Sequence, residues 1–282
     1  MPLNWIAVEP ALQQWLQEDI GRGDQTTLGL VNIESKQGSA QWIAKAPGIV
    51  AGLPVAARVF RILNQDVRFK PLAEEGQPIE AGQTIAAISG PLSALLTGER
   101  VALNLAMRLS GIATMTRRYA DAIADLPAQL VDTRKTTPGL RLLEKYATAA
   151  GGAKNHRFGL DDGIMIKENH IAAAGGIAAA IKQIRQSMPY PLTIEVETET
   201  IAQVETAIQH GADIIMLDNM LPSVMAQAVD LIRSAAVPIK IEASGNITLE
   251  TIRVVAQTGV DYISTSAPIT RAPWLDLSMR IQ

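Results

Sequence analysis

The stretch LTIEVETETIAQVETAIQHGADIIMLDN, from Leu192 to Asn219, contains the pattern that decides the fold of this chain. Its first apolar run predicts a strand, and residues 198–210 then repeat apolar side chains at the spacing of a helix. A second apolar run, which ends in Asp218 and Asn219, predicts another strand. A strand, a helix and a strand at this spacing indicate a parallel βα unit.

The same alternation extends through the second half of the chain. Parallel βα units can close into a barrel or spread into a doubly wound sheet, which would concentrate its site at one switch point. Here nearly every predicted strand ends in a reactive or hydrogen-bonding group, so we predict an α/β barrel. Only six strands are evident where a full barrel has eight, so we expect it to be incomplete. The other strand runs are AQLVDT (128–133), GIMIK (163–167), IKIEASG (239–245) and DYISTS (261–266), and the other helical patterns cover residues 140–150, 177–187, 223–235 and 248–258.

The first 110 residues have a different character. Short alternating apolar segments broken by glycine and proline predict small strands and turns, and EEGQPIEAGQTIAAISG (74–90) predicts a turn joining two strands as a hairpin. From about Leu96 to Asp125 the period becomes helical, and Arg100, Asn104 and Arg108 share one face of that helix. We therefore predict an N-terminal, β-rich α/β domain over residues 1–110 and the barrel domain over residues 111–270.

The composition excludes several classes of protein. The apolar share of 48% and charged share of 19% indicate a folded globular chain, and the net charge of −3 argues against nucleic-acid or membrane-surface binding. Without cysteine the chain has no disulfide, thiolate nucleophile or zinc–thiolate site. The N-terminus lacks a basic region, and no apolar run is long enough for a membrane span. We therefore expect a cytoplasmic protein.

Cationic side chains and one histidine gather at the first two strand ends of the predicted barrel. Strand ends converge in a barrel, so this many cations in a net-acidic chain indicate an anionic ligand, although an ion-pair network would also explain them. Arginine binds planar carboxylates and phosphates through two parallel hydrogen bonds, whereas lysine offers a point charge. Having both suggests more than one kind of anionic group. The residues are Arg134, Lys135, Lys154, His156, Arg157 and Lys167.

Carboxylates and hydrogen-bonding loops follow the later strands. Glu195 and Glu197 alternate along one strand and so point to the same side, while Asp218 ends the next strand. Such acids can hold a metal, hold sugar hydroxyls, stabilise a developing positive charge, or simply balance the lysines. The loops EASGNIT (242–248) and ISTSAPIT (263–270) offer backbone amides to a phosphate, with an ordinary βα turn as the alternative for either one.

Seven segments, in order and spanning nearly the whole chain, carry a resemblance to a known family. They are EDIGRGDQTT (18–27), GERVALNLAMRLSGIAT (98–114), VDTRKTTPGLR (131–141), KNHRFGLDDGIMIKENH (154–170), IEVE (194–197), IMLDN (215–219) and IEASGNI (241–247). Together they resemble the quinolinate phosphoribosyltransferase family. The resemblance implies an N-terminal α/β domain, an incomplete α/β barrel, and a tail (271–282) that returns to the N-terminal domain. It also implies transfer of phosphoribosyl from phosphoribosyl pyrophosphate to quinolinate, with decarboxylation to nicotinate mononucleotide in de novo NAD synthesis. Mg²⁺ would accompany the pyrophosphate.

The resemblance also implies roles for single residues. The quinolinate end would comprise Arg134, His156 and Arg157, with Thr133 as a further hydrogen-bonding group and Lys135 and Lys167 between the two anions. The catalytic residues would be Lys135, Glu197 and Asp218, the two acids lying at the ribose and possible ligands of the metal. The 5′-phosphate would be held by Ser244, Gly245, Asn246, Ser266, Ala267 and Pro268.

Arg100 resembles the residue that enters a neighbouring subunit's pocket, which implies a homodimer or a higher assembly of dimers. Two loops depart from the family pattern. Ser266 and Asn246 stand where glycine is usual, and Pro268 lacks a backbone donor. Asparagine tolerates positive φ, so we expect the turn at Asn246 to survive.

Two other functions remain open from the sequence. One is a Schiff-base aldolase on the same barrel, with Lys167 or Lys240 as the nucleophile. The other is a non-catalytic phosphate-ligand binder or a molybdenum-transport-associated relative of the family. Neither explains the whole set of charged residues, because an aldolase does not need NHR beside TRK, and a binder does not need Glu197 facing a sugar carbon.

Overall fold

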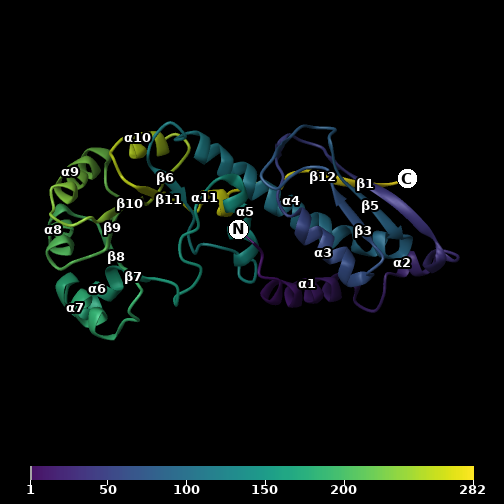
Figure 1. Cartoon of the computed structure of the whole chain (residues 1–282), viewed down its shortest axis with the longest axis horizontal. Coiled ribbons are helices and arrows are strands. Elements are labelled where there is room, and N and C mark those ends of the chain that lie inside the picture. Colours follow the sequence, from purple (N-terminus) through teal and green to yellow (C-terminus); the bar gives the residue numbers. More distant parts are fainter. Residues whose placement is uncertain (1) are drawn as a thin grey trace. The chain divides into compact units, whose positions relative to one another are not determined.

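The computed structural model describes residues 2–282, and the chain divides into two compact units (Figure 1). Unit 1 contains the chain up to Arg117 together with residues 136–152 and 268–282. Unit 2 contains residues 118–135 and 153–267. Segment 136–152 therefore packs in unit 1, although it is flanked in sequence by parts of unit 2.

A four-stranded antiparallel sheet forms the centre of unit 1. Its strand order is β12 (Leu277–Ile281), β1 (Gln37–Ala44), β5 (Thr84–Pro91) and β3 (Arg68–Pro71). Trp42 of β1 is buried, and its ring meets Phe69 edge-on with the ring centroids 5.5 Å apart. Because Ala40 to Ala44 of β1 pair with Ile281 to Leu277, the end of the chain is a strand of this sheet.

Helices supply the rest of the unit 1 core. The side chains of Leu12, Phe60 and Leu109 come from three of these helices and are all buried in one apolar cluster. The helices are α1 (Trp5–Ile20), α2 (Gln25–Leu28), a 3₁₀ turn at Ile33–Ser35, α3 (Leu53–Leu63), α4 (Leu92–Asp121), α5 (Arg141–Gly151) and the short α11 (Ala267–Thr270). The last residues of α4 and the first residue of α11 belong to unit 2.

The hairpin predicted over residues 74–90 is wrong. β4 (Pro78–Ile79) pairs with β2 (Gly48–Ile49) in a separate two-stranded sheet, while β5 pairs with β1 and β3. The chain turns at Gly82, which has a φ of 86°, and so enters the larger sheet. There Ile85 and Ile88 are buried, which a two-stranded hairpin would not have achieved.

Unit 2 contains a six-stranded parallel sheet, which confirms the prediction of an incomplete α/β barrel. β6 and β7 form the two edges of the sheet, so the barrel is not closed. The strand order is β6 (Gln129–Val131), β11 (Tyr262–Ser264), β10 (Lys240–Ser244), β9 (Ile214–Asp218), β8 (Ile194–Thr198) and β7 (Ile164–Ile166). All six strands fall inside the six apolar runs of the sequence, except that β8 extends one residue beyond the end of its run.

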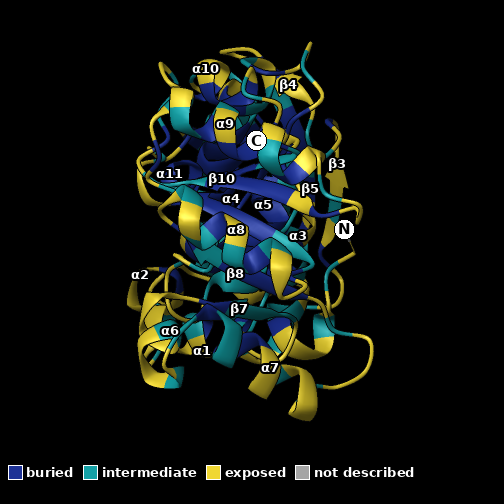
Figure 2. Cartoon of the chain, turned by 90° about the vertical axis from the view of Figure 1, so that its left-hand side faces the viewer, coloured by how far each residue is buried: buried dark blue, intermediate teal, exposed yellow. Residues whose placement is uncertain are grey.

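The helices of unit 2 lie along the outer side of this sheet (Figure 1), with their outward faces exposed and the strands beneath them buried (Figure 2). Helix α8 begins three residues after its predicted start, because Thr198 completes β8 and Thr200 caps the helix by accepting the Gln203 backbone N–H at 3.3 Å. The helices are α6 (Glu168–Ala174), α7 (Ile177–Ser187), α8 (Ile201–Gln209), α9 (Pro222–Arg233) and α10 (Ile252–Ala256).

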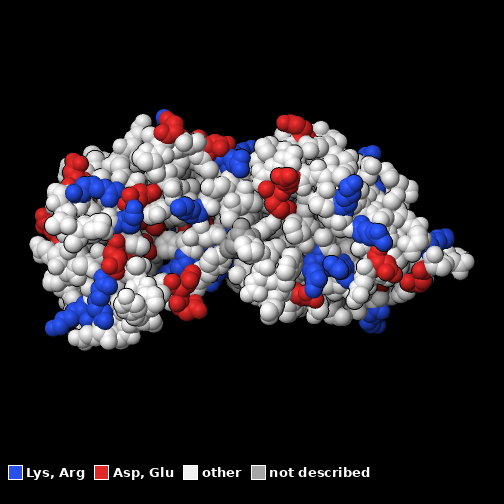
Figure 3. All heavy atoms as spheres, viewed as in Figure 1, with Lys and Arg blue, Asp and Glu red and all other residues white. Residues whose placement is uncertain are grey.

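The surface of the described residues agrees with the composition. On the face seen in Figure 3, positive and negative side chains are interspersed, without one extended basic area. Among the described residues, none of the helices combines the length and the apolar character that crossing a bilayer requires.

Candidate active site

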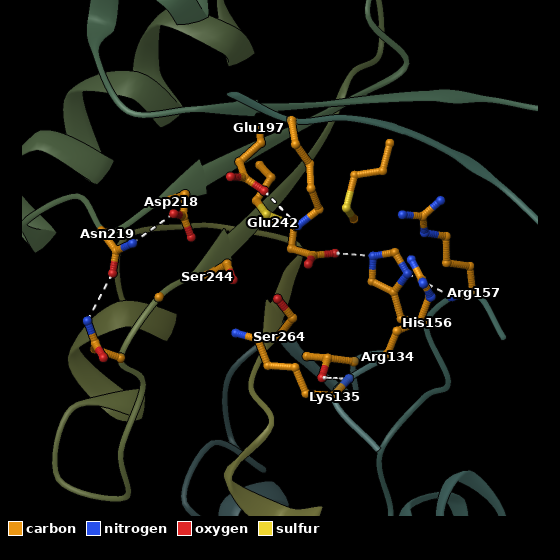
Figure 4. Close-up of a pocket in the computed structure, with 16 residues that line it drawn as sticks. Arg134, Lys135, His156, Arg157, Glu197, Asp218, Asn219, Glu242, Ser244 and Ser264 are labelled. Atoms are coloured by element: carbon orange, nitrogen blue, oxygen red, sulfur yellow. Dashed lines mark hydrogen bonds and ion pairs between the residues drawn. The ribbon is translucent and has the colours of Figure 1, made fainter. Parts of the chain in front are cut away.

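A pocket of about 460 Å³ lies at the carboxyl ends of the unit 2 strands (Figure 4). Parallel strands bring their carboxyl ends to one edge, so residues far apart in sequence meet there. Every residue that lines the pocket belongs to unit 2. They are Thr133, Arg134, Lys135, His156, Arg157, Met165, Lys167, Glu197, Met216, Asp218, Asn219, Glu242, Ser244, Gly245, Asn246 and Ser264.

One end of the pocket is cationic. Figure 4 shows Arg134, His156 and Arg157 together on this side. Burial, together with the positive charge of Arg134, lowers the pKa of the Arg157 guanidinium. Two arginines that repel each other in a partly buried place are stabilised by an anion with more than one negative charge. This end of the pocket therefore suits a planar dicarboxylate.

Buried Asp132 organises the loop that carries these residues. Its carboxylate accepts the His156 backbone N–H at 2.8 Å and the Asn155 side-chain amide at 2.7 Å. The imidazole Nδ1 of His156 in turn accepts the backbone N–H of Arg157 at 2.7 Å. The Arg157 guanidinium also donates to the Gly163 carbonyl at 2.8 Å. The position of Arg157 is thus fixed from both its backbone and its side chain.

The opposite side of the pocket is acidic. The Lys167 ammonium lies 3.1 Å from a carboxylate oxygen of Glu197, and the Asn219 amide donates to Asp218 at 2.7 Å. Burial and the negative charge of Glu197 raise the pKa of Asp218. Two carboxylates that repel each other at a half-buried site favour a cation or a developing positive charge between them.

The turn after β10 brings its backbone close to neighbouring groups at the pocket. Gly245 has a φ of 96°, and an added Cβ would lie 2.3 Å from the side-chain oxygen of Asn219. Asn246 has a φ of 50°, so the expectation that asparagine keeps this turn is confirmed. Its side-chain amide donates to Asn219 at 3.1 Å. The turn is held against the end of β9 and exposes backbone at the pocket.

Comparison with known proteins identifies the chain. The model of the quinolinate phosphoribosyl transferase N-terminal domain matches residues 24–110, and that of the C-terminal domain matches residues 112–280. The chain belongs to the quinolinate phosphoribosyltransferase family. A probable nicotinate-nucleotide pyrophosphorylase (carboxylating) of Synechocystis sp. is 60% identical over 98% of this chain and 93% of its own length. A Bacillus subtilis protein of the same name is 45% identical over 99% of this chain and 95% of its own.

Solved structures agree with this assignment. NadC from Streptococcus pyogenes is 40% identical, covers 100% of this chain and 99% of its own, and superposes with a TM-score of 0.95. The match extends over the residues of both units.

The structure brings most of the residues that the family resemblance implied into one pocket. Those that line it are Thr133, Arg134, Lys135, His156, Arg157, Lys167, Glu197, Asp218, Ser244, Gly245 and Asn246. Their individual roles remain predictions. Within VDTRKTTPGLR, Thr133 accepts the Lys135 backbone N–H at 3.0 Å, whereas Thr137 binds Glu144 through its backbone and hydroxyl, each at 2.8 Å. The hydroxyls thus divide between pocket and scaffold.

Four of the predicted residues do not line this pocket. Ala267 donates its backbone N–H to the Thr265 hydroxyl at 3.3 Å, so this donor already has a partner within the loop. Ser266 and Pro268, its neighbours, are likewise not among the lining residues. Arg100 lies in unit 1, where it lines a separate cavity of about 330 Å³ with Asp24 and Thr97.

Arg100 and Arg108 share one face of α4 but have different surroundings. Arg108 pairs with the buried carboxylate of Glu144 at 2.8 Å and also donates to the Ile269 carbonyl at 2.9 Å. It is a structural cation of unit 1. The sequence alone could not distinguish Arg108 from Arg100, because both residues lie on the same face of α4.

Five lining residues were not among the predicted site residues: Met165, Met216, Asn219, Glu242 and Ser264. The strand register could have identified two of them. Met216 of β9 lies between Glu197 of β8 and Glu242 of β10, so the three residues form one row across the sheet. Side chains in one row point to the same side, and Glu197 already pointed to the pocket.

Proposed function

We propose that this protein transfers the phosphoribosyl group of phosphoribosyl pyrophosphate to the ring nitrogen of quinolinate. The C1–O bond to pyrophosphate breaks, the C1–N bond forms, and the carboxylate next to the ring nitrogen leaves as CO₂ while a proton takes its place. The product is nicotinate mononucleotide, so the reaction belongs to de novo NAD synthesis. The names of the Synechocystis and Bacillus relatives support this activity.

The observation that carries the proposal is the separation of charge between the two ends of the pocket. A cationic end formed by Arg134 and Arg157 lies opposite a turn at residues 244–246, with the carboxylates of Glu197 and Asp218 beside that turn (Figure 4). The first end suits a dicarboxylate and the second a phosphate at a tight backbone turn. The two substrates would therefore lie end to end, with the sugar between them.

The acids beside the turn support the chemical step. Cleavage at the sugar carbon passes through an oxocarbenium-like state that carries positive charge. The Glu197 carboxylate stabilises that charge without needing to take a proton, and Asp218 adds to the negative field. Lys135 and Lys167 lie between the two anionic substrates and offset their mutual repulsion.

We propose Mg²⁺ as the metal that accompanies the pyrophosphate. Glu197, Asp218 and the Asn219 side chain offer the oxygen ligands that Mg²⁺ prefers. The raised pKa of Asp218 beside Glu197 also fits a cation there, because a divalent ion would relieve the repulsion. When bound, the metal would neutralise the charge of the leaving pyrophosphate.

We further propose a homodimer, or an assembly of dimers, in which Arg100 reaches the partner's quinolinate. The support is that Arg100 stands in a segment that resembles the family pattern, and that it lines an open cavity of unit 1. We place the protein in the cytoplasm, since a chain without cysteine suits a reducing compartment.

The aldolase alternative has little support in the geometry. Lys240 is 60% exposed at its side chain and lies 3.8 Å from Asp261, outside the residues that line the pocket. Lys167 is ion-paired with Glu197 and is not in the apolar surroundings that lower a lysine's pKa for Schiff-base chemistry. Borohydride trapping with a carbonyl substrate would detect either lysine if it were a nucleophile.

A direct assay tests the proposal. The protein is incubated with quinolinate, phosphoribosyl pyrophosphate and Mg²⁺, and nicotinate mononucleotide and CO₂ are measured. We expect equal amounts of both products. Nicotinate in place of quinolinate is the control and should not react, because it lacks one of the two carboxylates that the arginines bind. Equal reaction of nicotinate, or no reaction of either compound, would show the proposed function to be wrong.

A further inference from the structure

Asn219 follows β9 directly, and its side chain makes a hydrogen bond on each of two sides (Figure 4). Its amide nitrogen donates to a carboxylate oxygen of Asp218 at 2.7 Å. Its amide oxygen accepts the side-chain amide of Asn246 at 3.1 Å. Asp218, Asn219 and Asn246 thus form a chain of side chains that links the end of β9 with the turn after β10.

The carboxylate of Asp218 sets the direction of this chain. A carboxylate only accepts hydrogen bonds, so the Asn219 side chain must turn its NH₂ group, rather than its oxygen, to Asp218. The Asn219 oxygen then faces Asn246, which must present its own NH₂ group. The negative charge polarises the first amide, and a polarised amide oxygen is a better acceptor for the second amide. The two hydrogen bonds therefore depend on each other.

Backbone contacts hold the same two segments together. The Asn219 backbone N–H donates to the Ser244 carbonyl at 3.0 Å, beside the point where Ser244 pairs with Asp218 in the sheet. Gly245, the next residue, lies so close to Asn219 that an added Cβ would be 2.3 Å from the amide oxygen. The Asn219 side chain is therefore packed on the turn, and a movement of the turn must also move this amide.

Backbone conformation alone is the competing explanation for the two asparagines. Asn219 and Asn246 have φ values of 53° and 50°, which asparagine tolerates better than most residues do. Glycine adopts positive φ with less strain, however, and would serve the backbone at both positions. Asn32 is the other non-glycine residue with positive φ in the part of the chain that the structure describes, and its side chain does not cap the 3₁₀ turn after it. Positive φ by itself therefore does not produce the amide contacts found at the pocket.

Both amides are open to the pocket. Asn219 and Asn246 are exposed residues, and both line it. Water competes for hydrogen bonds at such a place, so the two amide contacts are weak in the ligand-free protein. A ligand that covers the turn excludes this water and strengthens both contacts. Occupation of the turn and the direction of the Asp218 carboxylate are therefore linked.

We propose that Asn219 and Asn246 are positioning residues that couple the turn at residues 244–246 to the carboxylate of Asp218. A phosphate bound at the turn orders Asn246, which holds Asn219, and Asn219 then directs the Asp218 carboxylate. The identities of the phosphate and of the Mg²⁺ ion beside Asp218 rest on the proposed function. Coupling of this kind is reciprocal, so a cation beside Asp218 strengthens phosphate binding at the turn by the same factor.

Calorimetry with phosphoribosyl pyrophosphate tests the coupling without turnover. Asn246→Gly is the decisive variant, because glycine accepts a φ of 50° without strain and the oxygens of Asp218 and Asn219 stay in place for a metal. In wild type, Mg²⁺ should tighten the binding of phosphoribosyl pyrophosphate. In Asn246→Gly this gain should be smaller by roughly two- to tenfold, the effect of one hydrogen bond. Asn32→Gly is the matched control, with the same substitution at a φ of 59° in an exposed position of unit 1, and should show the full gain.

A double-variant cycle separates positioning from ordinary stabilisation of the turn. Asn219→Gly and Asn246→Gly should each raise the Mg²⁺ concentration needed for half-maximal activity. Because Asn246 acts through Asn219, the double variant should need no more Mg²⁺ than Asn219→Gly alone. Effects that multiply would show that the two side chains act independently and would overturn the proposal. A lowered Tm of Asn246→Gly with an unchanged Mg²⁺ requirement would overturn it too, because the amide would then only stabilise the turn.

NMR of the side-chain amides tests the link in the absence of catalysis. The NH₂ signals of Asn219, assigned by their loss in Asn219→Gly, are followed while inorganic phosphate is added. They should shift in wild type and shift far less in Asn246→Gly, where phosphate still meets the backbone of the turn. Equal shifts in the two proteins, or none in wild type, would overturn the proposal. If quinolinate is not a substrate, the proposed function fails, but calorimetry and NMR still decide whether the turn and Asp218 are coupled.

Discussion

The ammonium of Lys167 and the carboxylate of Glu197 lie 3.1 Å apart, joining the ends of β7 and β8 at the pocket wall. The side chain of Lys167 is 48% exposed, whereas that of Glu197 is 16% exposed. An ion pair this open to water contributes little to stability, so its value is in orientation. The pair fixes the direction of the Glu197 carboxylate, which under the proposed function faces the sugar carbon.

Glu197→Gln is expected to lower kcat by roughly 10²- to 10³-fold, because the negative charge that stabilises the transition state is lost while shape is kept. The KM for quinolinate should change far less, since that ligand lies at the other end. The measurement is initial rates over both substrate concentrations. Glu199→Gln on the same strand end is the control and should retain wild-type rates; an unchanged kcat in Glu197→Gln would refute the role of this carboxylate.

Lys135→Ala is expected to lose on the order of 10² or more in kcat if the ammonium stabilises charge in the transition state. Lys135 follows Arg134 at the end of β6, and its backbone N–H is fixed by Thr133 at 3.0 Å. Comparison of kcat with both KM values separates the possibilities. A rise of KM alone, with kcat kept, would reduce Lys135 to a binding group.

Much of this site could be predicted from sequence for a geometric reason. A parallel sheet collects its carboxyl strand ends at one edge, so each short apolar run also located the polar residue after it. Arg134, Lys167 and Asp218 were found in this way, and all three line the pocket. The family resemblance then supplied roles that charge and spacing had left open.

The remainder depended on contacts that a sequence does not contain. Glu242 stood in the loop segment considered for phosphate, and only the strand register shows it in a row with Glu197. His156 accepts the backbone N–H of Arg157 at 2.7 Å, and no residue pattern reveals that contact. Residues 74–90 did not form the predicted hairpin, because β5 gains more burial in the larger sheet.

Gly245→Ala is expected to damage the turn that we propose for the phosphate. The residue has a φ of 96°, and the new Cβ would lie 2.3 Å from the Asn219 side-chain oxygen. Strain of this kind costs about 1–3 kcal/mol, so either stability falls or the turn moves. We expect a raised KM for phosphoribosyl pyrophosphate and a lowered Tm. Gly211→Ala is the control for positive φ alone, because no atom lies within 4 Å of its added Cβ. A Gly245→Ala protein with the KM of wild type would exclude this turn from phosphate binding.

Removal of Mg²⁺ with a chelator is expected to abolish product formation, and added Mg²⁺ should restore it. The metal would bind mainly with the pyrophosphate, so calorimetry should detect strong Mg²⁺ binding only when phosphoribosyl pyrophosphate is present. In Asp218→Asn more Mg²⁺ should be needed for half-maximal activity, because one oxygen ligand loses its charge. Full activity in the presence of the chelator would contradict the proposal.

Arg100→Ala is expected to be inactive or nearly so, yet to restore activity when mixed with a second inactive protein. If Arg100 serves the partner's pocket, a hybrid with Lys135→Ala contains one pocket in which both side chains are wild type. Unfolding and refolding the two variants together should then recover up to about a quarter of wild-type activity: half the dimers are hybrids, with one intact pocket each. Arg108→Ala cannot be used in place of Arg100→Ala in this test, because loss of the buried pair with Glu144 destabilises unit 1 itself. Mixtures no more active than the separate proteins would show that Arg100 does not act across subunits.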